Sequence, residues 1–472
     1  MERLTGPDAL MLNMENAHTP MHTLKVAILD STRRGRAITV DELVTTLPGY
    51  LGLFPRATQR IEWVPGCGAR PFWVPDEDFD ISAHIDEFTL DAPGGRDVLD
   101  ALLSELAVRQ LDRTRPLWAI TLVHGLANGT QAVVVRVHHA VADGVAALNV
   151  LMGATAEEGE TPVRVAVDPA ARAPGSRVLR RALRRDKWRQ FTGIPALVRD
   201  QVAGLMTTRT VNDAHLHPRP LGARRTSFNS PSADRRVCAS GSVPFAALQQ
   251  VAVATGTTVN GALHGIIAGA MRAEFLARGD DLSRPTVAVF GVAADVASPR
   301  TGGNEIATAA TYLRTDIEDP VVRVVETAAS CSAAVAKRRA IGFELTSSVT
   351  GYTGRLGPIF RELMAHHMPR VPNNITTANL PGPRSTRWIG DIEVVDWISF
   401  ALAIAPADVN LTTYSYAGSM NFGLVATPES MPDPAGFLRR LTAALEEVRA
   451  ALAADAHAAD EAPRVMASQD MT

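Results

Sequence analysis

The sequence predicts an α/β protein built from two successive lobes, and three observations support that prediction. The chain has 472 residues, which is too long for a single ordinary hydrophobic core. Its composition, 46% hydrophobic and 21% charged, is that of a folded protein. Helix and strand patterns alternate through the first third, stop at a polar linker, and begin again in the second half. We expect a lobe over residues 1–155, a basic linker over 156–225, a second lobe over 226–452 and a flexible tail over 453–472.

Two helices are expected before the first strongly β-forming runs. Thr39 stands three residues before Glu42, which is the spacing of a capping box at a helix start. A second helix is expected over residues 97–111, where apolar residues recur at helical spacing. Its apolar face would hold Val98, Leu102, Leu106 and Val108.

Residues 117–139 predict a β-hairpin whose second strand ends in two histidines. Two β-rich runs flank Asn128 and Gly129, a step that tolerates the positive φ angles of a tight hairpin turn. His138 and His139 then lie at the C-terminal end of the second strand. The residues just after Gly144 predict the next helix.

The linker contains a strongly basic segment. Seven arginines and lysines lie between Arg177 and Arg189, and Leu179, Leu183 and Trp188 form only a thin apolar stripe through them. One interpretation is a solvated helix that connects the lobes. The other is an interfacial segment attracted to anionic lipid.

The second half repeats the alternation of helices and strands. A helix closed by Gly279 is expected over residues 259–278, a strand over 284–295 and a long helix over 319–340. A second hairpin, over residues 408–427, turns at Ala417, Gly418 and Ser419. A terminal amphipathic helix follows.

Bulk properties exclude several classes of protein. The net charge of −3 gives no general reason to expect a nucleic-acid partner. Three widely spaced cysteines, Cys67, Cys238 and Cys331, suit a reducing cytosol better than a disulfide framework. The N-terminus does not resemble a signal peptide, and no apolar run reaches the roughly 18–20 residues of a membrane span. We therefore expect a cytoplasmic protein whose membrane contact, if any, is peripheral.

The two histidines and the nearby aspartate are the candidate chemical site. Neighbouring side chains of a strand point to opposite faces, so His138 and His139 should have different roles. Asp143 lies in the turn before the helix, where its carboxylate can pin the loop or reach an arginine elsewhere. Gly144 can adopt backbone geometries closed to other residues.

Three interpretations of this group compete. It can be a polar turn whose hydrogen bonds are all made within the protein. It can also be a metal site, although adjacent side chains of a strand diverge and no further cluster completes a coordination shell. It can also be a general-base site, because a neutral imidazole with a pKa of about 6.5 can take a proton from an attacking alcohol. The other histidine pair, His366 and His367, lacks the aspartate and glycine, and we expect no role for it.

The stretch HHAVADG, residues 138–144, resembles the HHxxxDG motif of the wax ester synthase/diacylglycerol acyltransferase family. These bacterial enzymes join acyl-CoA to long-chain alcohols or diacylglycerol. Further family elements occur in the family's order along the chain: PLW at 116–118, FNSP at 228–231, GTTVNG at 256–261, GGNEIA at 302–307 and NLPGPR at 379–384. The resemblance runs over about residues 4 to 450.

The resemblance implies two lobes like those of chloramphenicol acetyltransferase, with a tunnel between them. His139 would be the general base, Asp143 its structural partner, and His138 and Gly144 supports of the loop. The acyl group would pass from acyl-CoA directly to the acceptor, without an acyl-enzyme, to give triacylglycerol or a wax ester. Acyl-CoA would be a substrate, and neither a cofactor nor a metal is implied.

The resemblance also implies residues that bind substrate. They are Pro116, Leu117, Trp118, Asn260, Asn379 and Asn410. An oxyanion that develops during transfer needs hydrogen-bond donors, and Asn260 or Asn410 is a candidate. Structural alternatives stand beside these roles, because Trp118 can be a core residue and Asn410 an ordinary edge-strand residue.

Two positions depart from the family pattern. Gly261 stands where members carry an acidic residue, and Asp295 stands where they carry an arginine. An aspartate in place of an arginine reverses a charge and removes a planar fork of donors. Arg300, five residues further on, is the candidate to compensate.

Two other functions remain open at this point. One is a related acyltransferase with a different acceptor, and the other is a catalytically silent paralogue that binds acyl-CoA or lipid. In each case a peripheral contact with the inner membrane or with lipid droplets is expected through residues 177–189.

Overall fold

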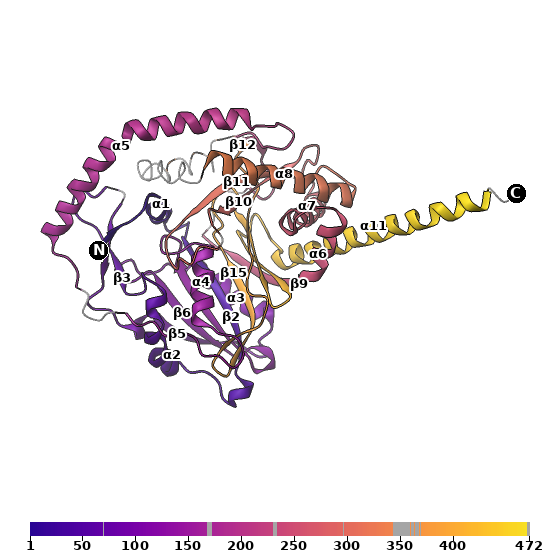
Figure 1. The fold of residues 1–472 in the computed structure, drawn as a ribbon. Helices are drawn as coiled ribbons and strands as arrows, with labels where there is room; N and C mark the ends of the chain where they lie inside the picture. Colours follow the sequence, from indigo (N-terminus) through magenta and orange to yellow (C-terminus); the bar gives the residue numbers. More distant parts are fainter. Residues whose placement is uncertain are drawn as a thin grey trace.

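The computed structural model describes residues 1–68, 70–167, 172–229, 234–295, 297–342, 359, 363, 368 and 370–469. The chain forms two sheet-containing lobes that lie against each other (Figure 1). The predicted α/β class with two lobes is therefore confirmed. The pair His366 and His367 lies outside the described residues.

The first lobe is built on a mixed six-stranded sheet with the order β14-β15-β2-β7-β6-β5. The strands are β2 (His22–Asp30), β5 (Ile85–Thr89), β6 (Trp118–His124), β7 (Gln131–His138), β14 (Arg387–Ile389) and β15 (Ile392–Phe400). The helices of this half are α1 (Gly6–Met14), α2 (Val40–Thr46), α3 (Arg96–Leu106) and α4 (Gly144–Ala154). β14 and β15 come from the second half of the chain, so the first lobe is completed by a segment distant in sequence.

Most of the local predictions for the first lobe are confirmed. Asn128 and Gly129 both have positive φ angles, 66° and 72°, in the turn between the antiparallel strands β6 and β7. The capping box of Thr39 and Glu42 is present at the start of α2. α3 buries Leu102 and Leu106 in the core of the lobe, as its apolar spacing predicts. The helix ends at Leu106 rather than at residue 111, so Val108 lies beyond it.

The second lobe is built on another six-stranded sheet, with the order β11-β10-β13-β16-β17-β9. The strands are β9 (Val237–Pro244), β10 (Thr286–Ala293), β11 (Ile306–Leu313), β13 (Ile375–Leu380), β16 (Val409–Tyr416) and β17 (Ser419–Ala426). The helices are α6 (Phe245–Ala254), α7 (Val259–Arg278), α8 (Pro320–Ile341) and α11 (Pro434–Gln469). α6, α7 and α11 share one apolar core with this sheet. The predicted end of α7 at Gly279 and the turn at Ala417 and Gly418 are confirmed.

Gly261 is explained by the packing of α7 against α8. A Cβ atom at this position would lie 2.7 Å from the Cβ of Ala328 on α8, and one at Gly265 would lie 2.7 Å from the Cα of Val324. Glycines four residues apart thus let the two helices approach closely. The departure from the family pattern at Gly261 is part of a helix contact that leaves no room for an acidic side chain.

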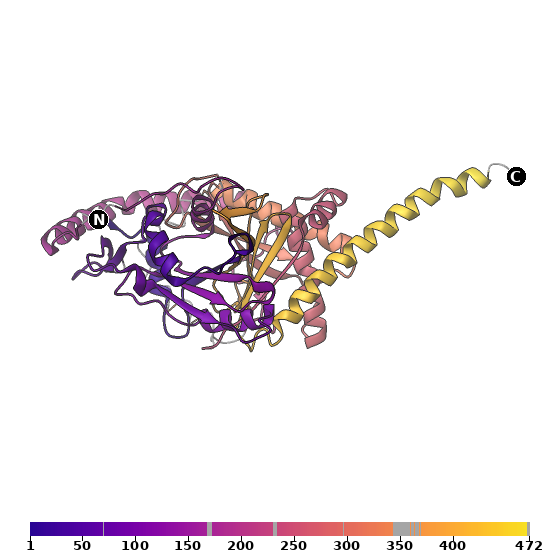
Figure 2. The same cartoon turned by 90° about the horizontal axis from the view of Figure 1, so that it is seen from below.

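Two small sheets and one long helix complete the fold. The sheets are β1-β4-β3, formed by β1 (Glu2–Arg3), β3 (Gln59–Glu62) and β4 (Phe72–Pro75), and β8-β12, formed by β8 (Ala223–Arg224) and β12 (Arg370–Val371). The long helix, α5 (Ser176–Thr210), runs along the outside of the molecule from the first lobe to the second (Figures 1 and 2).

No single helix in the described part of the chain is both long and apolar enough to cross a bilayer. Together α6 and α7 reach that length and hydropathy, but they meet at an angle of 99°. Most of α7 is buried in the core of the second lobe.

Candidate active site

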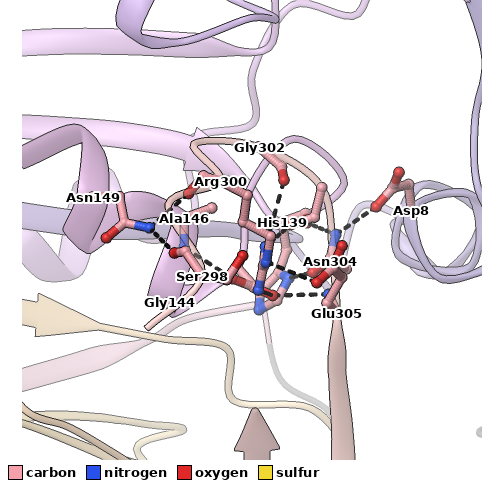
Figure 3. A network of polar contacts seen from close by, with 12 residues as sticks. Asp8, His139, Gly144, Ala146, Asn149, Ser298, Arg300, Gly302, Asn304 and Glu305 are labelled. Atoms are coloured by element: carbon pink, nitrogen blue, oxygen red, sulfur yellow. Dashed lines mark hydrogen bonds and ion pairs between the residues drawn. The ribbon is translucent and has the colours of Figure 1, made fainter. Parts of the chain in front are cut away.

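His139 emerges from the end of β7 at the junction of the two lobes. Its backbone N–H donates to the carbonyl oxygen of Met21 at 2.7 Å, which fixes the chain beside β2. His138 is fully buried, whereas His139 is partly exposed. Figure 3 shows that His139 faces the segment from Ser298 to Glu305 of the second half of the chain. The alternation of the strand therefore places the two imidazoles in different surroundings.

Asn304 determines which nitrogen of His139 carries the proton. The amide nitrogen of Asn304 donates to Asp8 Oδ1 at 2.8 Å and to the carbonyl oxygen of His139 at 2.7 Å. Its oxygen, Oδ1, therefore faces His139 Nδ1, 2.9 Å away, and accepts the Nδ1 proton (Figure 3). In the neutral ring Nε2 is then the unprotonated nitrogen, and it has no hydrogen-bond partner among the described residues.

The surroundings of His139 favour the neutral imidazole. Burial lowers the pKa of His139 below its ordinary value of 6.5, and the positive charge of Lys25 lowers it further. The carboxylate of Asp143 acts in the opposite direction, but it does not outweigh the other two effects. The ring can therefore accept a proton at neutral pH, as a general base must.

Lys25 is a buried amine on β2, in the same cluster. Its Nζ donates to Ser399 Oγ and lies 5.7 Å from the centre of the Tyr414 ring. Burial lowers the pKa of Lys25 to about 8, although the charge of Asp143 favours the ammonium form. Tyr414 in turn donates from its hydroxyl to the carbonyl oxygen of Gly144 at 3.1 Å. Strands of both lobes thus enclose the start of α4.

Asp143 holds the motif loop to the second half of the chain. One carboxylate oxygen accepts from the backbone N–H of Ala146 at 3.1 Å and caps α4. The other accepts from the backbone N–H of Glu305 at 2.9 Å and from Arg300 Nη2 at 2.5 Å. None of these hydrogen bonds joins Asp143 to His139 directly. The position of Asp143 fits the structural role that the motif predicts.

Arg300 supplies a cation to the aspartate of the motif, as expected of a residue that compensates for Asp295. Its guanidinium pairs with Asp143 and also donates to the carbonyl oxygen of Gly303 at 3.0 Å. Asn149 of α4 donates to the carbonyl oxygens of Ser298 and Arg300, both at 2.7 Å, and so fixes the loop that carries this arginine (Figure 3). Asp295 is exposed and accepts only a local bond from the N–H of Ala297. The charge reversal at position 295 therefore leaves the aspartate of the motif paired.

Gly144 fits a tight space rather than an unusual backbone conformation. It is the first residue of α4, and it is not among the residues with positive φ. A Cβ atom on it would lie 2.3 Å from Leu380 Cδ1 and 3.3 Å from Tyr414 Oη. The expectation of a special backbone geometry was wrong, because it overlooked the side chains that the other lobe places here.

His138 is enclosed on the opposite side of β7. Its Nδ1 accepts from the backbone N–H of Ala140 at 3.0 Å, so the proton of the neutral ring lies on Nε2, 3.7 Å from Glu15 Oε1. Burial alone would raise the pKa of Glu15, but His138 and Arg113 outweigh burial and lower it to about 2. His138 thus joins the motif loop to a buried carboxylate.

The PLW element lies between the core and a surface cleft. Leu117 and Trp118 are buried, and the indole N–H of Trp118 donates to the carbonyl oxygen of Ala57 at 2.8 Å. Trp118 also stacks on His84, with ring centres 4.4 Å apart. Pro116 and Trp118 line a cleft of about 290 Å³ that includes neither His139 nor Asp143. A direct role in binding substrate stays a prediction for these residues.

The structure brings two of the three predicted asparagines together. Asn379 donates to Asn260 Oδ1 at 3.1 Å, and Asn260 donates to Cys331 Sγ at 3.3 Å. Asn410 is buried and donates to the carbonyl oxygen of Leu402 at 2.9 Å. The amide groups of Asn260 and Asn410 are thus already engaged within the protein, and a role as oxyanion donor stays a prediction.

The three cysteines are buried and unpaired with one another. Burial raises the pKa of Cys331 to about 12, and it also raises that of Cys238. Both thiols are therefore poor nucleophiles at neutral pH. Across the described segments, no group of three or more His, Cys, Asp or Glu side chains is placed to hold a metal ion.

Sequence reasoning missed four residues of this site: Asp8, Lys25, Asn304 and Tyr414. Asn304 lies inside the GGNEIA element that the resemblance marks, so its importance was signalled but its partner was not. Asp8 lies in the N-terminal stretch LTGPDALMLNMENAHTPMH, residues 4–22, which also resembles the family, and Lys25 stands in an ordinary strand pattern. Only the folding of distant segments onto β7 makes them part of the site.

Comparison with known proteins identifies the relatives of the chain. The family model of the wax ester synthase/diacylglycerol acyltransferase catalytic domain matches residues 4–263, and the model of the WS/DGAT C-terminal domain matches residues 302–449. A Mycobacterium tuberculosis (strain H37Rv) protein, provisionally named a diacylglycerol O-acyltransferase, is 31% identical over 96% of both chains. A second protein of that strain, with the same provisional name, is 28% identical over 95% of this chain and 90% of its own.

Solved structures agree with the fold. The wax ester synthase/diacylglycerol acyltransferase from Marinobacter aquaeolei VT8 superposes with a TM-score of 0.70 at 22% identity, over 96% of this chain and all of that one. A mutant starter condensation domain of rhizomide synthetase, in complex with C8-CoA and Leu-SNAC, gives a TM-score of 0.54 at 14% identity, over 95% and 94% of the two chains. The arrangement of two lobes is thus shared with acyltransferases and condensation domains.

Proposed function

The chain belongs to the wax ester synthase/diacylglycerol acyltransferase family and is an acyltransferase, and from this premise we propose a specific reaction. The enzyme transfers an acyl group from acyl-CoA to the hydroxyl of diacylglycerol or of a long-chain alcohol. The products are triacylglycerol or a wax ester, together with free CoA. Acyl-CoA is a substrate, and the reaction needs no further cofactor.

The proposed mechanism uses one imidazole as base and then as acid. Nε2 of His139 accepts the hydroxyl proton while the alcohol oxygen attacks the thioester carbon. The tetrahedral oxyanion then collapses, the C–S bond breaks, and the CoA thiolate takes the proton back from Nε2. The imidazole is regenerated and no acyl-enzyme forms.

The observation that carries this proposal is the fixed tautomer of His139. Asn304 accepts the Nδ1 proton and is itself fixed by Asp8, so Nε2 remains the basic nitrogen. Asp143 and Arg300 hold the loop without occupying Nε2. An oriented, neutral imidazole at a lobe junction is what direct transfer to a hydroxyl requires.

The acceptor class is supported by the relatives. Two M. tuberculosis relatives carry the provisional name diacylglycerol O-acyltransferase, and the Marinobacter protein is named a wax ester synthase as well. A rhizomide condensation domain with a similar fold was solved with C8-CoA. We therefore propose acyl-CoA as the donor and a lipid hydroxyl as the acceptor.

The test supplies purified protein with radiolabelled acyl-CoA and either diacylglycerol or a long-chain alcohol. We expect ester to form in equal amounts with released CoA, and His139→Ala to abolish both. An amine acceptor serves as the comparison, because faster transfer to it would overturn the choice of a hydroxyl. Acyl-CoA binding without turnover on any acceptor would mark a silent lipid-binding paralogue instead.

We also propose that the enzyme works at a lipid surface, on the inner membrane or on lipid droplets. Both proposed acceptors and their products are lipids that partition out of water. The basic first half of α5 gives such a surface an electrostatic attraction.

A further inference from the structure

The outer side of α5 carries one continuous row of residues that changes from basic to apolar along the helix. The row contains Arg177, Arg180, Arg184, Trp188, Phe191, Pro195, Val198, Val202 and Leu205. Successive members are three or four residues apart, so they share one face of the helix. The first three are cations and the next six are apolar.

The apolar part of this row is exposed. The exposed fractions are 68% for Trp188, 68% for Phe191, 56% for Val198, 52% for Val202 and 55% for Leu205. Neighbouring large apolar side chains with such exposure are unusual on a folded protein and mark a surface that binds something. The row is therefore a candidate docking surface, which we call the α5 row.

At the start of α5, the opposite face packs against the first lobe. Leu179 and Leu183 are buried in a cluster with Phe72 and Val74 of β4. On this side Asp186 pairs with Arg3 of β1. The first third of the helix is thus anchored by its inner face, which is opposite to the α5 row.

The charge of α5 differs from that of the rest of the chain. The helix carries nine arginines and lysines and two aspartates, a net charge of +7, in a protein whose net charge is −3. The remaining residues therefore sum to −10. A strong local positive charge on an acidic protein selects for an anionic surface.

We propose that the α5 row docks the protein on the surface of an anionic phospholipid bilayer, an inference that rests on the lipid acceptor proposed above. The arginines meet the headgroups, and the stripe from Trp188 to Leu205 enters the boundary between headgroups and acyl chains. A helix with this division of basic and apolar residues is suited to lie in the plane of the membrane interface, because it is too polar to span the bilayer. Trp188 is placed where an indole is most favourable, between apolar and wet surroundings.

The test measures binding of the full chain to vesicles by flotation, and it does not depend on activity. We expect binding to phosphatidylcholine vesicles that contain phosphatidylglycerol, and weaker binding to phosphatidylcholine alone. The variant Trp188→Ser with Phe191→Ser should lose at least about tenfold in binding, since each aromatic side chain buries a large apolar area. Val253→Ser with Leu276→Ser is the matched control, because these residues of α6 and α7 are 82% and 59% exposed but lie off the α5 row. The control should bind like the wild type.

Two further measurements separate the parts of the row. Arg180→Gln with Arg184→Gln should remove most of the difference between the two vesicle types and most of the salt sensitivity. The fluorescence of Trp188, isolated as the difference between wild type and Trp188→Phe, should be quenched by lipids brominated on their acyl chains.

Three outcomes would overturn the proposal. Equal flotation of the Trp188, Phe191 variant and its control would show that the stripe does not bind lipid. Equal binding to neutral and anionic vesicles would remove the role of charge. A dimer in solution that the same double substitution dissociates would identify a second copy of the chain as the occupant. Loss of transferase activity with detergent-dispersed substrates would bear on the proposed reaction, not on docking.

Discussion

The two sides of the end of β7 carry the same residue type in opposite settings. On one side His139 is partly exposed and is held by Asn304 and Asp8, which come from other elements of the fold. On the other side His138 is sealed against Glu15 within the first lobe. The tautomers are also opposite, with the proton on Nδ1 of His139 and on Nε2 of His138.

This difference shows that the function of an imidazole depends on which nitrogen its neighbours leave free. The nitrogen of His138 that lacks a proton accepts from Ala140, so it is already used within the loop. The unprotonated nitrogen of His139 is not used in this way. His139 lies near the cationic Lys25, whereas His138 lies beside the carboxylate of Glu15.

Replacing each histidine should separate the two roles and give the largest effect. His139→Ala should lower kcat by about 10²- to 10⁴-fold, the usual contribution of a general base, while Tm stays close to that of the wild type. His138→Ala should lower stability by about 1–3 kcal/mol, because it leaves Glu15 buried with fewer partners. Assays of CoA release and thermal unfolding of both variants check this, and equal kcat losses would contradict the division of roles.

Arg300→Met should weaken the connection between lobes on the His139 side. Asp143 would remain buried without its cation, and breaking such a pair costs about 3–5 kcal/mol. We expect a lower midpoint in urea unfolding. Adding Asp143→Asn to this variant should restore part of the stability, because the buried charge is then absent. No recovery in the double variant would mean that the ion pair is not what holds the loop.

Asn304→Leu should disturb the tautomer without removing the base. We expect kcat to fall by about tenfold to a hundredfold, as for other groups that orient a catalytic imidazole. Asn304→Asp should instead raise the pKa of His139, because a carboxylate favours the imidazolium. The acid limb of the kcat/KM profile should then move to higher pH. If the acid limb stays at the same pH in Asn304→Asp, residue 304 does not influence the pKa of His139.

Lys25→Met should give the smallest effect, a shift of pH dependence. In the wild type the pKa of His139 is lowered, so His139 stays neutral and active at pH values below 6.5. Removing the cation raises that pKa, and the acid limb of the kcat/KM profile should move up by about one pH unit or less. Arg33→Met is the control, because Arg33 is an exposed cation of the first lobe that pairs with Glu158, and it should leave the limb in place. A limb that both substitutions move equally would mean that Lys25 has no specific effect on His139.

The sequence was sufficient for the parts of the fold that local chemistry determines. The hairpin at Asn128 and Gly129, the capping box at Thr39 and the end of α7 at Gly279 follow from residues that are close in sequence. The motif from His138 to Gly144 was equally readable, because its members are close together in the chain.

The remainder of the site depends on contacts between segments that are distant in sequence. Asn304 reaches His139 across 165 residues, and Arg300 reaches Asp143 across 157. The pairing of β15 with β2, which places Ser399 opposite Lys25, is also long-range. The reason for Gly144 was missed for the same cause, since Leu380 and Tyr414 come from the other lobe. Periodicity and spacing carry no information about such encounters.

The proposed mechanism depends on the protonation state of His139, which nitrogen NMR of histidine-labelled protein measures. The signals of His139 are identified by their loss in His139→Ala. We predict a neutral ring at pH 7, protonated on Nδ1 and unprotonated on Nε2, that titrates below pH 6.5. A ring protonated on Nε2, or one that is already an imidazolium at pH 7, would be incompatible with His139 as the general base.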